Sequence, residues 1–145
     1  MNDLVFRTEK LTGRITRIHA FCGEIMYLVE GADRAALIDT GSGIGDLKKC
    51  VDHLTDKPCI VLLTHGHVDH AMGAAQFDPV YMNFRDEHIF RQHASQDFRE
   101  ESLQTLVPPY QADASDLQPS PDPGSFRDLE EGDRFDLGGD RKSVV

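Results

Sequence analysis

The sequence lacks the long apolar run of a membrane-spanning helix, because no stretch approaches the roughly 18 consecutive apolar residues that such a helix needs. Its first ten residues, MNDLVFRTEK, also lack the basic and then apolar segments of a secretory signal peptide. Cysteine is scarce, and Cys22, Cys50 and Cys59 form no C-x-x-C pair. This favours buried thiols in a reducing compartment over a disulfide framework. We therefore expect a cytoplasmic protein with no membrane partner.

Basic residues are also in short supply. The chain has 15 Lys and Arg against 25 Asp and Glu, which gives a net charge of −10. This balance argues against nucleic acid bound through a general basic patch. The length of 145 residues is typical of a single domain that is large enough to bury a core.

The first third of the sequence predicts three strands and a helix. Alternating apolar residues indicate strands within 13–23, at Ile25–Glu30 and at Ala35–Asp39, with a turn between the last two. The segment GSGIG predicts a turn, with Ser42 near the start of a helix. The apolar residues of this helix lie on one face, at spacings of three, four and three: Ile44, Leu47, Val51 and Leu54.

The following residues continue the alternation of strands and helices. Cys59–Leu63 is short and apolar throughout, which is typical of a strand covered on both faces. A short helix, a strand at 79–83 and a helix at 85–94 are expected next. Residues 94–125 hold five of the seven prolines and predict an irregular loop or excursion within the same domain. A β-hairpin is expected around 131–133. The pattern indicates an α/β domain with a partly parallel sheet.

A cluster of histidines follows the apolar strand, in the segment THGHVDH. Side chains two residues apart point the same way in an extended chain, so His65 and His67 can reach one metal ion. Asp69 and His70 come one turn later and face a second position. Imidazole and carboxylate ligands suit zinc, iron or manganese. The cluster therefore predicts two divalent ions at the carboxyl end of a buried strand, the usual place for an active site in an open α/β sheet.

The alternative without a function is that these are surface loop histidines that bind no metal. Four ligand-type residues at fixed offsets after an apolar strand rarely arise by chance, so we favour the metal site. The segment GSGIG is not expected to bind phosphate, because it lacks the Lys-Ser/Thr of a P-loop. His88 and His93 lie on the helix predicted at 85–94, five residues apart, and are expected to face solvent.

The segment THGHVDH resembles the signature of the metallo-β-lactamase superfamily, and ALIDTG resembles that family's third-strand motif. The resemblance covers roughly residues 12–139. It implies half of an αββα sandwich, with a mixed sheet and flanking helices. It also implies that His65 and His67 bind the first metal, that Asp69 and His70 bind the second, and that Asp39 orients a ligand. Asp69 would also position the attacking water.

The sequence departs from the family in one respect. Members complete the site with later histidines and an aspartate, whereas this sequence has no histidine after His93. We therefore expect the amino-terminal half of the fold, cut short before those ligands, with doubtful activity as an isolated chain. A half-domain would expose an apolar face, which predicts a homo-oligomer or a complementary half-domain as partner.

The resemblance implies a metal-dependent hydrolase, in which metal-activated water attacks an ester, thioester, lactone or similar bond of a small molecule. Zinc is the expected metal, with iron or manganese as alternatives. Two other functions stay open. One is an iron-dependent persulfide dioxygenase of the same fold, and the other is a non-catalytic remnant or interaction module.

Overall fold

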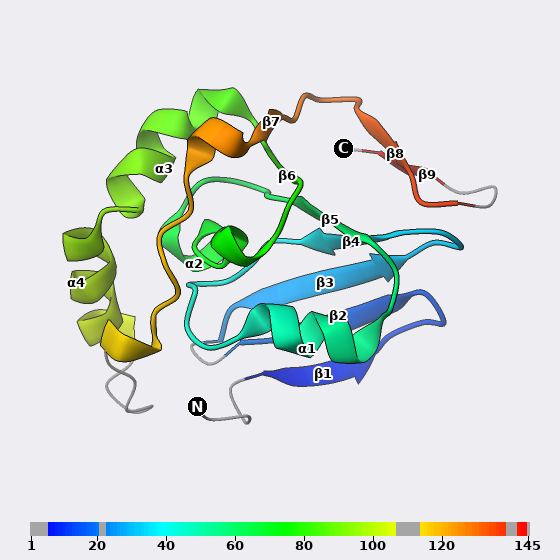
Figure 1. Ribbon diagram of the computed structural model, residues 1–145, viewed down its shortest axis with the longest axis horizontal. Helices are drawn as coiled ribbons and strands as arrows, with labels where there is room; N and C mark the ends of the chain where they lie inside the picture. Colours follow the sequence, from blue (N-terminus) through cyan, green and yellow to red (C-terminus); the bar gives the residue numbers. More distant parts are fainter. Residues whose placement is uncertain (1–5, 21–22, 107–113, 139–141, 145) are drawn as a thin grey trace.

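The computed structural model describes residues 6–20, 23–106, 114–138 and 142–144. Seven strands form one mixed sheet, and a smaller two-stranded sheet lies to one side (Figure 1). The strands are β1 (Arg7–Lys10), β2 (Ile15–His19), β3 (Ile25–Glu30), β4 (Ala35–Ile38), β5 (Cys59–Leu62), β6 (Val80–Met82), β7 (Arg127–Asp128), β8 (Arg134–Asp136) and β9 (Lys142–Val144). The α-helices are α1 (Leu47–Leu54), α2 (Val68–Ala71), α3 (Glu87–His93) and α4 (Gln96–Leu106). Short 3₁₀ turns cover Ala74–Gln76, Phe84–Asp86, Ala114–Asp116 and Pro123–Ser125. Among these residues no helix is long and apolar enough to cross a membrane.

The large sheet changes from antiparallel to parallel at β4. Strands β1 to β4 pair antiparallel, each with its neighbour in sequence, whereas β4 to β7 pair parallel. Each parallel step needs a crossover connection, and α1 supplies the one between β4 and β5. The carboxyl ends of parallel strands meet at one edge of the sheet, so the loops after β4, β5 and β6 come together there. The predicted mixed sheet with flanking helices is confirmed.

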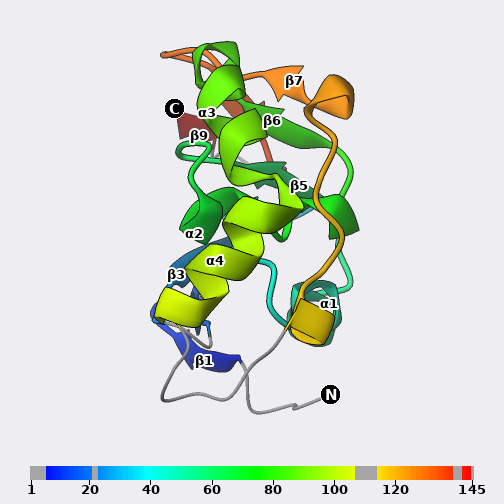
Figure 2. The same ribbon diagram turned by 90° about the vertical axis from the view of Figure 1, so that its left-hand side faces the viewer.

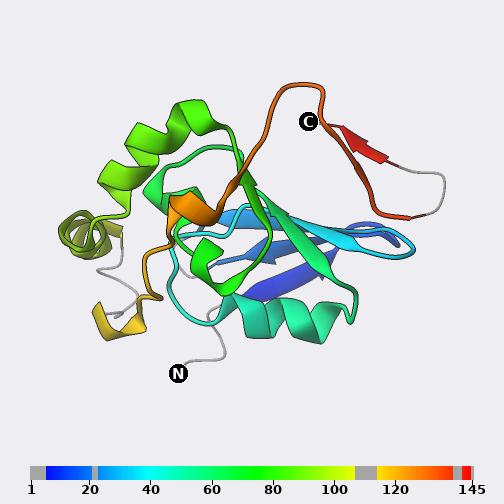
Figure 3. The same ribbon diagram turned by 45° about the horizontal axis from the view of Figure 1, so that its top comes forward.

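Alternate residues of the central strands point to opposite faces of the sheet and build two cores. On one face, Leu37 and Val61 pack with side chains from α1, α2 and α3. On the other face, Ile60 packs with Leu129 and Leu137, which come from the chain on either side of β8. Figure 3 shows α1 below the sheet and the β8–β9 pair above it. Strand β5 is therefore covered on both faces, as its sequence predicts.

Helix α1 begins four residues later than the GSGIG segment suggests. Asp46 caps it by accepting a hydrogen bond from the Lys49 amide at 3.0 Å, so Ser42 is not the cap. Ile44 lies outside the helix and forms an isolated β-bridge with Leu117. Leu47 and Val51 are the buried residues of the helix, at the spacing expected of one apolar face.

Asp46→Ala is expected to lower the free energy of unfolding by about 1 kcal/mol, because it removes the N-cap of α1. The Asp46 carboxylate also accepts a hydrogen bond from Gln76 Nε2 at 2.9 Å, and this bond is lost as well. Thermal or urea denaturation measures the change. Asp52→Ala is the matched control, because it removes only the exposed ion pair with Lys48 and is expected to cost about 0.3 kcal/mol. Equal effects of the two substitutions would contradict the capping role.

The prediction of an irregular stretch at 94–125 is wrong for its first half, where α4 runs from Gln96 to Leu106. Figure 2 shows α3 and α4 following one another along one side of the molecule. The helix escapes sequence analysis because it has no apolar stripe. Its buried residues include Leu103 and, unexpectedly, Arg99.

Arg99 anchors α4 through its charged group. Its guanidinium donates to the Gln118 carbonyl oxygen at 2.7 Å, to Ser120 Oγ at 3.0 Å and to the Ser42 carbonyl oxygen at 3.4 Å. The side chain is 1% exposed, and this burial lowers the pKa of the guanidinium. Arg99 thus links α4 to the loop after β4 and to the segment before the turn at Pro123–Ser125.

The predicted β-hairpin around 131–133 is also wrong. Strand β7 pairs with β6 in the large sheet, whereas β8 pairs with β9 in the small one. The turn between β7 and β8 does form, and Asp133 Oδ2 accepts a hydrogen bond from the Glu130 amide at 2.8 Å. The turn therefore forms as expected, but the strands on its two sides belong to different sheets.

Candidate metal centre

The histidine cluster lies at the edge of the sheet where β4 and β5 end. His65 and His67 are in the loop after β5, and Asp69 and His70 are in the first turns of α2. The Asp39 amide, just past β4, donates to the Leu62 carbonyl oxygen at 3.0 Å and keeps the two strand ends in register. The site is therefore built on the ends of two paired parallel strands, as the sequence predicts.

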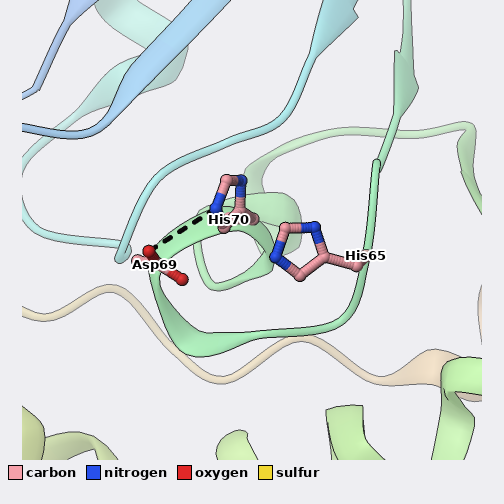
Figure 4. A group of neighbouring side chains, drawn as sticks. All are labelled: His65, Asp69 and His70. Carbon is pink, nitrogen blue, oxygen red and sulfur yellow. Dashed lines mark ion pairs between the residues drawn. The ribbon is translucent and has the colours of Figure 1, made fainter.

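Three side chains converge on one point. One ligand atom from each of His65, Asp69 and His70 lies within 4.8 Å of the other two. Figure 4 shows the side chains of His65, Asp69 and His70 close together, and Asp69 Oδ2 lies 3.5 Å from His70 Nε2. All three residues are partly exposed, so an ion can reach them from solvent.

The buried carboxylate of Asp39 organises this group from behind. Asp39 Oδ1 accepts a hydrogen bond from the Thr64 amide at 2.7 Å, and Oδ2 accepts from Thr64 Oγ1 at 2.8 Å. His70 Nδ1 lies 2.8 Å from the same Oδ2. Asp39 is 5% exposed and has a φ of 67°, a left-handed conformation that aspartate tolerates better than most residues. The position thus favours a short side chain with a carboxylate.

The hydrogen bonds of Asp39 and Thr64 fix the tautomers of two histidines. A neutral His70 donates its Nδ1–H to Asp39 and keeps the lone pair of Nε2 free. Thr64 has a single hydroxyl proton and donates it to Asp39, so at 3.0 Å it accepts the Nδ1–H of His65. His65 Nε2 is then also unprotonated. Both imidazoles therefore offer a free Nε2, which is the state that binds a metal.

The protonation state of His65 agrees with this arrangement. Burial, and then the neighbouring imidazoles of His70 and His67, lower the pKa of His65 below its ordinary value. Its ring is therefore neutral at pH 7. A neutral imidazole is a metal ligand, whereas an imidazolium is not.

His67 is placed differently from the other three residues of the motif. Its ring meets the ring of His65 edge-on at 4.6 Å between centroids. It does not belong to the convergent group of His65, Asp69 and His70. The assignment of His65 and His67 to one metal, and of Asp69 and His70 to a second, stays a prediction.

Helix α3 adds residues to the site that the sequence analysis missed. Asp86, the N-cap residue of α3, and Phe90 and His93 within the helix follow one another at spacings of four and three and face the loop after β5. Asp86 Oδ2 accepts a hydrogen bond from the Gly66 amide at 3.1 Å, and a Cβ on Gly66 would lie only 3.0 Å from Phe90 Cβ. The spacing of Asp86, Phe90 and His93 could have predicted from the sequence that His93 lies against the site. The spacing of His88 and His93 could not.

The prediction that His93 faces solvent is wrong. Its Nδ1 accepts a hydrogen bond from the Val68 amide at 2.9 Å, and its ring stacks on His67 at 5.1 Å between centroids. His88 is exposed, as expected. The two histidines lie on different sides of α3, and only His93 faces the loop.

Comparison with known proteins agrees with the motif. A model of the metallo-beta-lactamase superfamily matches residues 21–144. No match was found among curated protein sequences.

Solved structures of metallo-beta-lactamases share the fold. The class B3 di-zinc enzyme LRA-12 from an Alaskan soil metagenome is 20% identical, with a TM-score of 0.61, and the match covers 95% of this chain and 50% of that chain. The subclass B3 enzyme BJP-1 of Bradyrhizobium japonicum is 20% identical, with a TM-score of 0.57, and the match covers 96% of this chain and 50% of that chain. The chain spans about half the length of the enzymes it matches.

Proposed function

Because this chain belongs to the metallo-beta-lactamase superfamily, we propose that it provides the metal-binding part of a metal-dependent hydrolase. The observation that carries the proposal is the convergence of His65, Asp69 and His70, with ligand atoms within 4.8 Å of one another. Asp39 and Thr64 add a second line of support, because their hydrogen bonds engage Nδ1 of each imidazole and leave Nε2 of the neutral rings free for an ion.

The donor set suits zinc. Two neutral imidazoles and one carboxylate are the number and kind of protein ligands that catalytic zinc sites use, with a fourth position left for water. His67 lies beside His65 and can add a further imidazole. We propose His65, His67, Asp69 and His70 as the ligands, and zinc as the metal.

When bound, such an ion lowers the pKa of a coordinated water toward 7 and polarises the oxygen of the bond under attack. The chain's own groups have separate tasks. Asp69 has a side chain that is 48% exposed, so its carboxylate can orient the attacking water and receive its proton. Asp39, through Thr64 and His70, keeps the imidazoles from turning away. The proposed substrates are small molecules with an ester, thioester, lactone or β-lactam bond.

Turnover by this chain alone is expected to be low. The chain spans about half the length of the metallo-beta-lactamases it matches, so the remaining groups of the site would come from another polypeptide segment. We propose a second copy or a complementary half-domain as the partner and the cytoplasm as the location. On the face away from α1 the apolar side chains of Val29, Ile38 and Tyr81 are only partly buried, which supports such a partner.

The test is the metal content of the purified chain. After dialysis against micromolar zinc, elemental analysis is expected to find about one zinc ion per chain, because three converging ligands suffice for catalytic zinc. Dipicolinate should remove the ion. Hydrolysis of a chromogenic ester and a chromogenic β-lactam is measured with and without dipicolinate, and any turnover should stop when the metal is removed. A folded chain that retains no zinc would overturn the proposal.

One observation favours a second candidate. Two histidines and one carboxylate are also the donor set of non-haem iron oxygenases, and His65, Asp69 and His70 supply it. The alternative function is therefore an iron-dependent persulfide dioxygenase. The same elemental analysis separates the two, because the alternative requires bound iron and oxygen consumption with a persulfide substrate, whereas the hydrolase requires neither.

A further inference from the structure

His67 is held in a different way from the other histidines of the motif. His65 and His70 have hydrogen bonds that lead back to Asp39. Among the residues that the structure describes, none forms a hydrogen bond with the ring of His67. Its ring instead contacts two other rings, edge-on at His65 and face-on at His93. The orientation of this exposed side chain therefore depends on ring packing.

His93 is itself firmly placed. Its ring lies between His67, at 5.1 Å and an interplanar angle of 19°, and Phe98 of α4, at 4.2 Å and 26°. Its Nδ1 accepts the Val68 amide at 2.9 Å, which ties it to the first residue of α2. The stacked rings of Phe98, His93 and His67 thus join α4, α3 and the loop after β5.

The hydrogen bond to Val68 also defines what His93 can do. Because Nδ1 uses its lone pair to accept the amide, a neutral His93 carries its proton on Nε2. That nitrogen is a donor and has no lone pair for a metal. This is the opposite tautomer from His65 and His70. His93 therefore supports the ring of His67 by packing against it, and does not serve as another metal ligand.

We propose that His93 is a positioning residue, which holds the ring of His67 beside His65, within reach of an ion bound at the site. The inference rests on the proposed function, because it assumes that His67 contributes to metal binding. An unrestrained, exposed histidine would lose rotamer freedom on binding an ion, and this loss would weaken binding. The stack on His93 removes that freedom before the ion arrives, as groups that orient metal ligands generally do.

Two substitutions separate the ring of His93 from its hydrogen bond. His93→Phe keeps a flat ring between His67 and Phe98 but cannot accept the Val68 amide. His93→Asn keeps an acceptor near the position of Nδ1 but removes the ring. His88→Ala, on the exposed side of the same helix, is the matched control. Thermal denaturation of each apo-protein shows whether the fold is retained.

Zinc affinity is measured by competition with a chromophoric chelator. His93→Asn is expected to weaken zinc binding about tenfold, the lower end of the effect of removing groups that orient metal ligands. His93→Phe is expected to restore affinity to within about threefold of the original protein, and His88→Ala should leave it unchanged. Unaltered or tighter binding in His93→Asn, or equal losses in His93→Asn and His93→Phe, would overturn the proposal.

A measurement without metal distinguishes this inference from the proposed function. In the apo-protein, NMR signals of the His67 ring should report one orientation in the original protein and in His93→Phe, and averaging in His93→Asn. If the original chain binds no zinc, the hydrolase proposal fails, and the ring signals still show whether His93 orders His67. If zinc binds but the His67 signals are the same in all three proteins, only the positioning role is overturned.

Discussion

Replacing His65 and His70 together with alanine is expected to remove bound zinc from the protein. The two substitutions take away both imidazoles of the convergent group and leave Asp69 as its only member. Asp69 and the remaining imidazole of His67 do not retain zinc against dialysis, because catalytic sites need about three protein ligands. Elemental analysis should therefore find zinc at background level, and chromogenic ester hydrolysis should equal the rate with dipicolinate.

The controls for this variant are other histidines of the same chain. His53→Ala in α1 and His88→Ala in α3 remove imidazoles that lie outside the site and should leave zinc content unchanged. Both metal-site residues are partly exposed, so the double variant is expected to remain folded. Zinc retained in the double variant, with its fold intact, would show that the ion binds elsewhere and would remove the basis of the proposed mechanism.

Asp39→Ala is expected to damage both stability and metal binding. The substitution leaves the Thr64 amide without its acceptor and places alanine at a φ of 67°, and together these cost about 3 kcal/mol of unfolding free energy. It also frees His70, and through Thr64 it frees His65. Loss of groups that orient metal ligands reduces affinity ten- to a hundredfold, and we expect about a hundredfold here because two ligands are affected.

Two further variants separate these contributions. Asp39→Gly removes the backbone strain and should recover about 1 kcal/mol of stability, with no gain in zinc affinity. Asp39→Asn keeps Oδ1 as the acceptor for the Thr64 amide and tolerates a positive φ, but the NH2 group that replaces Oδ2 is a donor and cannot accept the Nδ1–H of His70. It should be close to the original protein in stability and still bind zinc weakly. Tight zinc binding by Asp39→Asn would contradict the role of Asp39 in setting the tautomers.

Local sequence patterns predicted the part of the fold around the candidate site. The apolar run before Thr64 identified β5, and the residues ahead of Asp39 identified β4, because buried parallel strands are continuous apolar segments. The offsets within the motif placed four ligand-type side chains at a strand end. The expectation that Asp39 orients a ligand is consistent with its contacts to Thr64 and His70.

The errors have a common physical cause, which is that long-range partners were not visible in the sequence. Helix α4 is anchored by the buried guanidinium of Arg99, and a periodicity search for apolar residues cannot detect a polar anchor. The segments on either side of the turn at 130–133 do not pair with each other, because β7 pairs with β6 and β8 pairs with β9. His93 was compared with His88, whereas the relevant partners are Asp86 and Phe90 on the same helical face.

The order of strands in the large sheet has a consequence for how the protein is made. The strands lie side by side in the order in which they occur in the chain, from β1 to β7. A ribosome releases β1 first, and every later strand can join the free edge of a sheet that already exists, without being inserted between earlier strands. The loop after β5, which holds His65 and His67, emerges with that strand, but α3, which packs against it, is synthesised later. In a nascent chain the proposed metal ligands are therefore synthesised before His93, the residue proposed to position His67.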